Sequence, residues 1–348
     1  MTDTPETALQ DETEGDAGQR YAGDFSAPKG NLAFFLDLDP PTSDFRQDVH
    51  EGLSLAQKQL SPKYLYDERG SSLFQNITEL ATYYPTRVER ALFDRFSNEI
   101  AGAVGPRPTL LEYGAGSPDK IARLLSLFIK PSGYVAVDIS RDFLLSGMDA
   151  FAGQSDVPVG AVAADFTTPF TLPMDYIDTG AGMVGVFLGS TIGNLTRDVT
   201  LSFLRAAGET LGPRSKLLIA VDLEKDEGQL ATAYNEPEGV TAQFISNVLP
   251  RMQRELGAEL NTDHFSYHIS FGSNPQAVEM FLKADRETTI SLDEKSYPFE
   301  EGETLMISQS RKYSLPGFEA LLDDCPWRLQ HSWNDTDENY AVTLLERD

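Results

Sequence analysis

Two glycines and two aspartates near the middle of the chain are placed as in a nucleotide-binding site. Gly114 and Gly116 follow an apolar run, and glycines there let the backbone turn sharply while a ligand approaches it closely. Asp138 ends the next apolar run, where open α/β folds bind a ribose diol through a carboxylate. A third run ends in Asp165 and Phe166. This order of residues predicts a site for a nucleoside-containing cofactor.

The glycine turn also favours one cofactor over another. It reads Gly-Ala-Gly-Ser-Pro over residues 114–118, so it lacks the third glycine that packs a pyrophosphate-binding helix. An acid for the ribose and an acid at the adenine edge, without a second phosphate site, indicate S-adenosylmethionine. The alternative, an NAD-dependent dehydrogenase, rests only on the glycine turn and the acid that follows it.

A second candidate site is the small-residue turn at residues 189–195. An apolar strand predicted over 182–188 runs directly into this turn. The carboxyl ends of parallel strands are where open α/β sheets bind their ligands. Asn194 offers both a donor and an acceptor, which suits the carboxylate or the amine of a zwitterionic substrate. The alternative is that Asn194 caps the helix predicted for 200–211.

Alternating strand and helix patterns over residues 88–222 predict the α/β sheet that must position these groups. The alternation stops over 223–314, where helices at 228–234 and 240–256 precede three strand-like runs. That block is predicted to be an inserted substrate subdomain. A helix at 315–324 then leads into two final strands, which we expect to form an antiparallel hairpin.

The amino-terminal third divides into two kinds of sequence. Residues 1–30 are acidic and poor in apolar side chains, which predicts a disordered tail. Residues 31–87 are helical in pattern and rich in aromatic residues. Four tyrosines lie close to helix-breaking residues there and are expected to line the edge of a pocket, with the rim of the core as the alternative. They are Tyr64, Tyr66, Tyr83 and Tyr84.

The composition excludes several classes of partner. With 54 acidic and 28 basic residues the 348-residue chain carries a net charge of −26, which opposes binding to nucleic acid or to an anionic membrane. A single cysteine, Cys325, excludes an internal disulfide, and four scattered histidines give no expectation of a metal site. Neither a secretion signal nor an apolar stretch of ~20 residues is visible. We therefore expect a soluble, cytoplasmic protein.

Four segments together resemble one family closely: the S-adenosylmethionine-dependent histidine N-alpha-methyltransferases, which make hercynine on the way to ergothioneine. The resemblance runs from about residue 45 to the carboxyl terminus. The stretch at 187–196 is far more specific than a generic glycine turn. The segments are PKYLYDERGSSLF at 62–74, YYPTR at 83–87, FLGSTIGNLT at 187–196 and GVTAQF at 239–244.

The resemblance implies an α/β fold with a Rossmann-like class I methyltransferase sheet and an inserted α+β substrate-binding domain. Residues 88–222 and 315–348 would form the methyltransferase domain that binds S-adenosylmethionine. Residues 31–87 and 223–314 would form the substrate domain. We further expect a cytoplasmic monomer whose partner is a small-molecule amino-acid substrate.

The family's site residues can be carried over one position at a time. In the family pattern, Asn194 and Tyr234 hold the amino-acid carboxylate, while Tyr66, Tyr83 and the backbone near Gly189 and Thr191 surround the amine. Tyr66, Tyr83 and Asn194 are the expected catalytic residues. The expected cofactor residues are Gly114, Lys120, Asp138, Asp165 and Phe166. The expected substrate residues are Tyr66, Tyr83, Gly189, Thr191, Asn194, Tyr234, Met280, Ser308 and Ser310.

One position departs from the family pattern. Where the histidine enzymes place a glutamate that binds the imidazole, this chain has Ser308. A serine offers a hydrogen bond but no charge, so its hold on the imidazole N–H is weaker. The expected reaction is methylation of the α-amine of L-histidine to the trimethylated betaine, with tryptophan, tyrosine or a derivative as the alternative acceptor. A non-catalytic ligand-binding module is a more distant alternative, opposed by the intact Gly114, Asp138 and Asn194.

Overall fold

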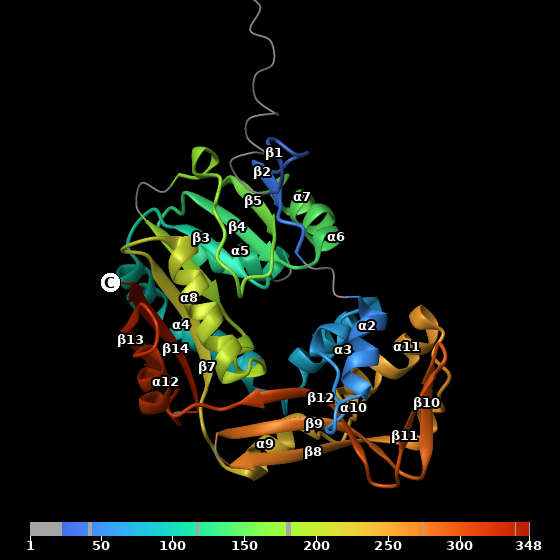
Figure 1. Ribbon diagram of the computed structural model, residues 1–348. Helices are drawn as coiled ribbons and strands as arrows, with labels where there is room; N and C mark the ends of the chain where they lie inside the picture. The colour runs from blue at the N-terminus through green and yellow to red at the C-terminus, as the bar shows by residue number, and fades with distance from the viewer. Residues whose placement is uncertain are drawn as a thin grey trace, which may run out of the picture.

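The computed structural model describes residues 23–40, 44–115, 118–178, 182–273, 275–337 and 339–347. Figure 1 shows a larger part, built on a twisted sheet with helices on both faces, and a smaller part of helices and short sheets beside it. The chain passes from the larger part into the smaller one and back again twice, after β2 and after β7. The two parts meet where the pocket described below lies.

Within the described residues, nine strands form the large sheet, in the order β1-β2-β5-β4-β3-β6-β7-β14-β13. The strands from β2 to β7 in this order are parallel, while β1, β14 and β13 are antiparallel to their neighbours. The strands are β1 Asp24–Ser26, β2 Phe34–Asp37, β3 Thr109–Tyr113, β4 Gly133–Asp138, β5 Val159–Ala163, β6 Met183–Phe187, β7 Lys216–Asp222, β13 Trp327–Asn334 and β14 Tyr340–Arg347. The predicted α/β sheet and the predicted closing hairpin are both confirmed.

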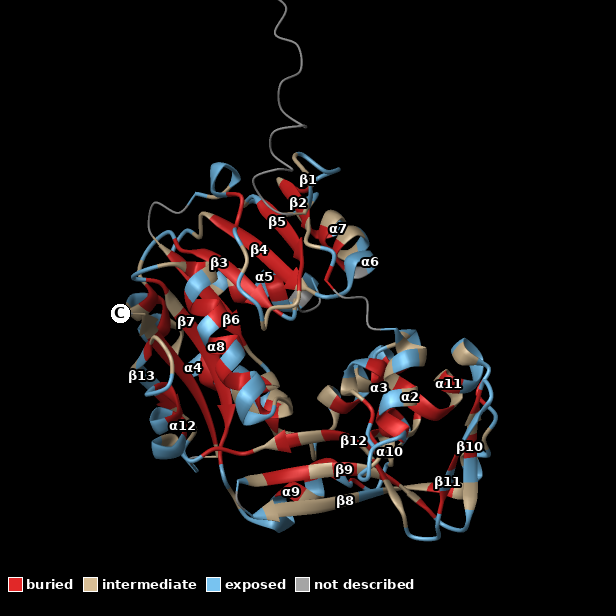
Figure 2. Cartoon of the chain, in the orientation of Figure 1, coloured by how far each residue is buried: buried red, intermediate tan, exposed pale blue. Residues whose placement is uncertain are grey.

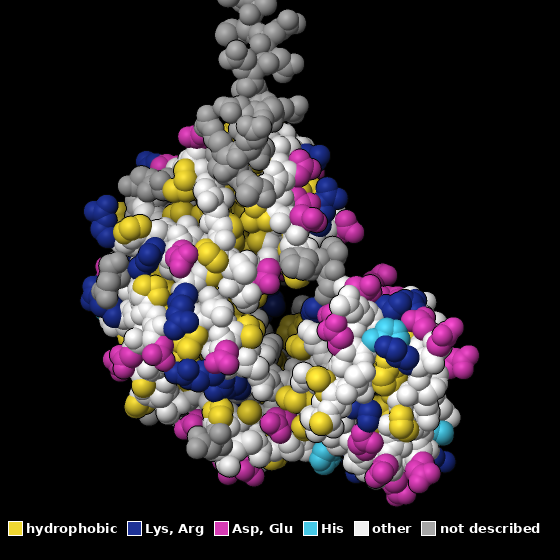
Figure 3. All heavy atoms as spheres, viewed as in Figure 1, with side chains coloured by type: hydrophobic (Ala, Val, Ile, Leu, Met, Phe, Trp, Pro, Cys, Tyr) yellow, Lys and Arg dark blue, Asp and Glu magenta, His cyan; other side chains and the backbone are white. Residues whose placement is uncertain are grey.

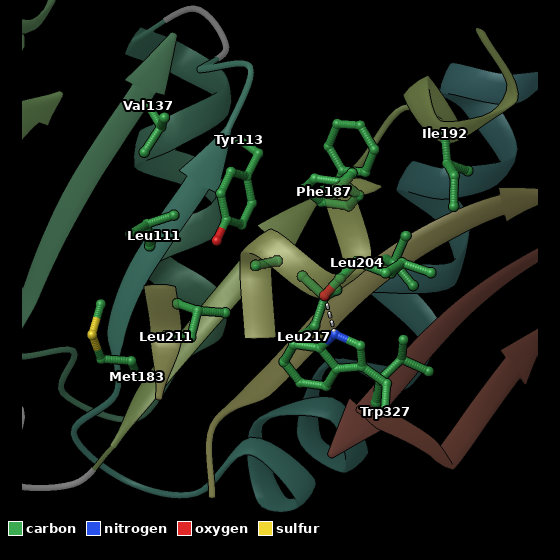
Figure 4. Close-up of a cluster of buried hydrophobic side chains, with 14 of the residues drawn as sticks. Leu111, Tyr113, Val137, Met183, Phe187, Ile192, Leu204, Leu211, Leu217 and Trp327 are labelled. Carbon is green, nitrogen blue, oxygen red and sulfur yellow. Dashed lines mark hydrogen bonds between the residues drawn. The ribbon is translucent and has the colours of Figure 1, made fainter. Parts of the chain in front are cut away.

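Helices cover both faces of this sheet, which explains why β3, β5 and β6 are buried along their whole length. The helical segments of this part are α4 Tyr84–Val104, α5 Pro118–Leu127, α6 Arg141–Phe143, η2 Leu144–Met148, α7 Asp149–Ala152, η3 Met174–Tyr176, η4 Thr191–Asn194, α8 Arg197–Leu211 and α12 Leu315–Leu322. In the hydrophobic core shown in Figure 4, Tyr113 and Phe187 pack against residues of α8. The Trp327 indole Nε1 donates to the Leu204 carbonyl at 2.7 Å in this core, so a buried polar group has its partner.

The smaller part has a hydrophobic core of its own, which Figure 2 shows as a separate buried zone. This core combines residues of the 49–77 segment with residues of the 230–307 segment. Among its described strands, β12, β9 and β8 form one sheet in that order, and β10 pairs with β11. The elements are α2 Phe45–Leu53, η1 Pro62–Leu65, α3 Glu68–Glu79, α9 Glu227–Tyr234, α10 Val240–Ser246, α11 Val248–Leu256, η5 Thr262–His264, β8 Phe265–Ser273, β9 Gln276–Ala284, β10 Thr288–Leu292, β11 Lys295–Phe299 and β12 Thr304–Arg311.

The segment between β7 and α12 leaves the large sheet and returns to it at one place. The Tyr313 N–H donates to the Asp222 carbonyl at 3.0 Å, and the Glu224 N–H donates to the Tyr313 carbonyl at 3.0 Å. Leu223 and Tyr313 form a parallel bridge. The outgoing and returning chains therefore run side by side at the junction of the two parts.

Two predicted boundaries near the amino terminus are wrong. β1 falls inside the predicted tail of residues 1–30, and β2 falls inside the segment 31–87 that was expected in the substrate domain; both strands belong to the large sheet. Phe34 of β2 packs over Gly160 of β5, where an added Cβ would lie 2.1 Å from the phenyl ring. A strand of four residues is stabilised by such partners rather than by its own pattern, so its sequence gave little signal. Residues 1–22 of the predicted tail lie outside the described residues.

The insertion also differs from its prediction in two places. The single helix expected at 240–256 is divided into α10 and α11. Pro250 has no N–H to donate to Ser246, the last residue of α10, and that missing bond explains the interruption. The hairpin of β10 and β11 was not predicted, because its strands have only five residues each and β11 contains a proline. The helix at 228–234 and the three other strands of the insertion are confirmed.

Candidate active site

A pocket of about 160 Å³ lies between the turn after β6 and the smaller part of the molecule. Figure 3 shows the surface hollowed between the two parts, with hydrophobic side chains at the edge of the hollow. Residues from α3, η4, α9, α10, β9 and β12 line the pocket together with the segments that flank them. The lining residues are Tyr66, Phe74, Ile77, Tyr83, Pro85, Gly189, Ser190, Thr191, Asn194, Tyr234, Thr241, Phe244, Ile245, Met280, Ser308 and Ser310. All nine residues predicted from the resemblance to contact substrate are among them.

The turn after β6 forms the wall on the sheet side. Gly189 has a φ of 72°, which favours glycine, and its N–H donates to the Glu89 carboxylate at 2.7 Å. The Thr191 hydroxyl donates to the Leu188 carbonyl at 2.8 Å. Thr196, not Asn194, caps α8 by accepting from Val199. The cap alternative for Asn194 is therefore wrong, and its side chain lines the pocket instead.

Aromatic side chains form the opposite wall. Tyr66 is 45% exposed and contacts Phe74 and Phe244 edge to face, with ring centroids 5.6 and 5.3 Å apart. Tyr83 contacts Tyr234 in the same way at 6.0 Å. Burial raises the pKa of the Tyr83 and Tyr234 hydroxyls well above the ordinary value, so both remain protonated at neutral pH. They can position a substrate by hydrogen bonds, and they are not bases.

The tyrosines predicted to edge a pocket divide evenly. Tyr66 and Tyr83 line the pocket. Tyr64 is buried and donates to Asp48 at 2.6 Å, as expected for a core residue. Tyr84 points to the junction between the parts, where it meets Asp222. The prediction is therefore correct for Tyr66 and Tyr83 and wrong for Tyr64 and Tyr84.

Strands β9 and β12 close the pocket floor. Ser308 and Met280 are register partners across these strands, and a bulge lies between Met306 and Ser308. Ser308 and Ser310 both reach the pocket, as expected for alternate residues of a strand. The floor is therefore polar but uncharged at the position where the family has a glutamate.

A cluster of buried charges beneath the floor was not predicted. The Lys312 ammonium donates to Asp222 at 2.6 Å, to the Tyr234 hydroxyl at 2.8 Å and to the Ser310 hydroxyl at 2.7 Å. Lys225 also forms an ion pair with Asp222, and the Tyr84 hydroxyl donates to both Asp222 oxygens at 2.9 and 2.7 Å. Burial lowers the pKa of Lys312 and lowers that of Lys225 to about 8, although the Asp222 carboxylate opposes both shifts. The sequence signal that was available for this cluster is the position of Asp222 at the end of a parallel strand.

The predicted cofactor residues lie along the same carboxyl edge of the sheet as the turn after β6, at the ends of β3, β4 and β5, and we call this stretch the cofactor edge. Gly114 has a φ of 72°, and an added Cβ would meet no atom within 4 Å, so the turn leaves open space. Asp138 accepts from the Ser140 N–H at 2.8 Å, and burial raises the pKa of its carboxyl. Asp165 accepts from the Thr167 N–H at 2.9 Å. This open turn flanked by two carboxylates fits a nucleoside.

Two further predicted residues complete that edge. Phe166 packs against Tyr113, Phe187 and Phe203, with ring centroids 5.5 to 6.1 Å apart. Lys120 is exposed on α5. Neither these two nor Gly114, Asp138 and Asp165 line the pocket of the substrate residues. Gly116 and Ser117, which also belong to the predicted glycine turn, lie outside the described residues.

Glu89 of α4, which contacts the turn after β6, was not predicted. Its carboxylate accepts from the Gly189 N–H at 2.7 Å and from the Tyr340 hydroxyl at 2.8 Å. Burial raises the pKa of Glu89, and the nearby charge of Lys120 opposes that rise. A carboxylate four positions after Pro85, on a helix that starts at the pocket, gave no distinctive sequence signal.

The structure gives no metal centre in the portion of the chain that it describes: no group of three histidine, cysteine, aspartate or glutamate side chains is arranged to hold an ion. His264 instead contacts Asn261 at 3.0 Å and Thr288 at 2.9 Å. None of the described helices is long and apolar enough to cross a membrane.

Comparison with known proteins agrees with this geometry. The family described as "Histidine-specific methyltransferase, SAM-dependent" matches residues 45–347. The histidine N-alpha-methyltransferase of Mycolicibacterium smegmatis is 34% identical over 324 residues, which cover 91% of this chain and 99% of that protein. The Mycobacterium tuberculosis protein of the same name is 34% identical over 323 residues, with the same coverage. The N-methyltransferase dtpB of Aspergillus flavus is 24% identical over 317 residues, 87% of this chain and 89% of that protein.

These matches confirm the predicted family, the predicted methyltransferase activity and the predicted cofactor, S-adenosylmethionine. With its strand order and its open edge at β3, β4 and β5, the large sheet is the class I methyltransferase sheet that the sequence led us to expect. The chain belongs to the family of histidine-specific, S-adenosylmethionine-dependent methyltransferases.

Proposed function

We propose that this enzyme transfers methyl groups to the α-amino group of L-histidine and produces the Nα-trimethylated betaine, hercynine. The observation that carries the proposal is the convergence of nine expected substrate residues, from segments far apart in the sequence, on one pocket of about 160 Å³. The two relatives that are 34% identical to the chain are named for this reaction.

Within this proposal the pocket positions the amino acid by its two ends. Asn194 and the Tyr234 hydroxyl bind the carboxylate. Tyr66 and Tyr83 surround the amine and, because Tyr83 stays protonated, they orient its lone pair through neutral hydrogen bonds. The amine must lose a proton before each transfer. Orientation of this kind can contribute on the order of 7 to 11 kcal/mol to a bimolecular reaction.

The cofactor edge would hold S-adenosylmethionine through two carboxylates that accept local hydrogen bonds, Asp138 from Ser140 and Asp165 from Thr167. Asp138 would bind the ribose diol, and Asp165 with Phe166 would bind the adenine edge. Gly114 would let the cofactor approach the backbone, and Lys120 would lie at the rim. When bound, the cofactor supplies a methyl group on a sulfonium.

Recognition of the acceptor ring is the point at which a second acceptor has support. Ser308 lies on the pocket floor beside Met280, so the floor has no carboxylate at the place of the family's glutamate. A neutral floor suits a larger or less basic ring, such as that of tryptophan or tyrosine. We favour histidine because the other carried-over positions, Met280 and Ser310 included, match the histidine pattern.

We also propose a division of labour and a setting. The sheet domain binds the cofactor, and the smaller part, made of the 44–83 segment and the 223–314 insertion, binds the substrate; their shared core supports this division. The enzyme is proposed to act as a cytoplasmic monomer on free amino acids, without nucleic-acid or membrane partners, consistent with its charge of −26. Light scattering of the purified chain tests the oligomeric state.

Mass spectrometry of an amino-acid panel incubated with enzyme and S-adenosylmethionine tests the proposal. We expect mono-, di- and trimethylated histidine to accumulate in sequence. Methylation of tryptophan or tyrosine, with histidine ignored, would replace histidine by the second acceptor. No methylated amino acid at all would leave a non-catalytic binding module. Calorimetric titration with S-adenosylhomocysteine and with NAD checks the cofactor independently.

A further inference from the structure

The hydrogen bonds around Lys312 leave one hydrogen without a partner inside the cluster. An ammonium has three donors and no acceptor, so Lys312 uses all its hydrogens on Asp222, Tyr234 and Ser310. The Tyr234 and Ser310 hydroxyls, 2.9 Å apart, share one further bond that either can donate. Three hydrogens of Lys312 and two hydroxyl hydrogens therefore serve four internal bonds. The remaining hydrogen belongs to Tyr234 or to Ser310, and both line the pocket.

The positive charges of the cluster also favour a hydroxyl that donates toward the pocket. Two ammonium groups, Lys312 and Lys225, contact one carboxylate, Asp222, whose side chain is 1% exposed. The Lys312 side chain is fully buried, and its Nζ lies 4.6 Å from the centre of the Tyr234 ring. Asp222 already has a cation in Lys225 and a hydrogen bond from the Tyr84 hydroxyl, shared between its two oxygens. Lys312 is therefore more than the counterion of Asp222.

We propose that Lys312 is a positioning residue that fixes the hydrogen-bond polarity of the pocket floor: it donates to both hydroxyls, Ser310 donates to Tyr234, and the Tyr234 hydroxyl is the one donor of the pair that faces the substrate. This inference rests on the proposed function, in which Tyr234 binds the carboxylate of the amino acid. A ligand with an anionic or acceptor group at Tyr234 is selected, and a ligand with a donor there is rejected.

Comparing an acid with its amide tests the proposal. For wild type and Lys312→Met, kcat/KM is measured with L-histidine and with L-histidinamide, whose carboxamide presents donors as well as an acceptor. We expect the acid-to-amide ratio to fall about tenfold in Lys312→Met, mainly through KM for the acid. Without Lys312 the Tyr234 hydroxyl is no longer held as a donor, so its charge-assisted hydrogen bond to the substrate carboxylate is weakened. General damage to the fold lowers both values and leaves the ratio unchanged. Affinity for S-adenosylhomocysteine is expected to stay constant.

Lys216→Met is the matched control. Lys216 is a part-buried lysine at the opposite end of β7, where it donates to the carbonyls of Ala103 and Val104. Its replacement is expected to leave the ratio as in wild type. If Lys312→Met does not fold, Tyr84→Phe serves instead. This variant removes the hydrogen bond that the Tyr84 hydroxyl shares between the two Asp222 oxygens, and it should lower the acid-to-amide ratio about threefold.

An unchanged ratio in a folded Lys312→Met or, failing that variant, in Tyr84→Phe overturns the role of Lys312 while leaving the proposed function intact. A wild type that methylates tryptophan but not histidine changes the acceptor alone, and L-tryptophan with L-tryptophanamide then provides the same ratio. A wild type that methylates and binds none of the four probes overturns the proposed function and this inference together.

Discussion

The cofactor edge and the floor of the substrate pocket are built in opposite ways. Asp138 and Asp165 accept their hydrogen bonds from residues two positions further along the chain. At the pocket floor, Tyr84 and Asp222 are separated by 138 positions, and Lys312 and Asp222 by 90. The cofactor edge is thus organised by local turns, whereas the floor exists only when distant segments have packed.

This difference separates binding from folding. Carboxylates at the cofactor edge have few partners to lose, so changing them should affect ligand affinity more than stability. The carboxylate beneath the pocket floor holds two cations and a tyrosine, so changing it should affect stability first. Four substitutions test this contrast, from the largest expected effect to the smallest.

Asp222→Ala should unfold most easily. It leaves Lys312 and Lys225 buried without their anion, and removing one partner of a buried pair costs about 3 to 5 kcal/mol. Urea denaturation monitored by circular dichroism measures the free energy of unfolding. Asp94→Ala, which breaks an exposed pair with Arg123, is the control and should cost about 0 to 1 kcal/mol. Equal losses in the two variants would contradict the contrast.

Asp138→Asn should show the reverse pattern. Loss of a charged acceptor for the ribose diol is expected to weaken S-adenosylhomocysteine binding by about 1.5 to 3 kcal/mol, or roughly ten- to a hundredfold. The free energy of unfolding should change by less than about 1 kcal/mol, because Asn can still accept from the Ser140 N–H. Calorimetry and urea denaturation of the same preparation decide the matter. A large stability loss with unchanged affinity would argue against this edge as the cofactor site.

Ser308→Glu sharpens the comparison within the pocket. If histidine is the acceptor, the new carboxylate adds a charge-assisted bond to the ring of about 1.5 to 3 kcal/mol, and kcat/KM rises by one to two orders of magnitude at most. If the acceptor is tryptophan or tyrosine, the carboxylate is buried without a partner and activity is lost. Ser308→Gln, of similar size but neutral, is the control. A wild type that methylates another aromatic amino acid but not histidine defeats our choice.

Asp67→Asn gives the smallest effect, and its pH dependence has a definite sign. Burial raises the pKa of Asp67, but hydrogen bonds from Gly70, Asn247 and Arg254 outweigh burial and leave the pKa below 3.8. The folded pKa is depressed, so the stabilisation is present above the unfolded value of 3.8 and is lost as pH falls below it. The variant should be up to about 1 kcal/mol less stable at neutral pH, because it loses the ion pair with the exposed Arg254.

Urea denaturation over a range of pH checks this expectation. The wild type and Asp67→Asn should converge in stability at the lowest pH, where Asp67 is protonated in both states. Asn at this position retains the cap of α3, so the difference reports the charge alone. A difference that persists unchanged below the folded pKa would show that the loss is steric.

The features that could be predicted from the sequence are those that depend on residues close together in the chain. The glycine turn, the acids at strand ends and the α/β alternation all lie within short stretches, and the spacing of apolar residues located β3 to β7. Asn194, Tyr66 and Tyr83 were each singled out from their local sequence, but the full substrate set came from a family resemblance. No spacing rule brings Tyr66, Asn194 and Ser308 together. β2 was missed because its partner β5 supplies its stability.

Lys312 shows why the remaining part could not be predicted. In sequence it is a charged residue near the end of a strand pattern, which usually means an exposed side chain. Its burial depends on Asp222, which precedes the insertion, and on Tyr84, which lies at the start of α4. This buried ion pair requires two residues that are far apart in the sequence, so it cannot be predicted from either residue alone.

The meeting of the outgoing and returning chains at Leu223 and Tyr313 has a consequence for how such enzymes diversify. Because the ends of the insertion lie side by side, the sheet needs no adjustment when the length or content of the insertion changes, and closing a longer loop costs little more. We propose that residues 223–314, which contribute Met280, Ser308 and Ser310 to the pocket floor, can change with the acceptor while the large sheet stays the same.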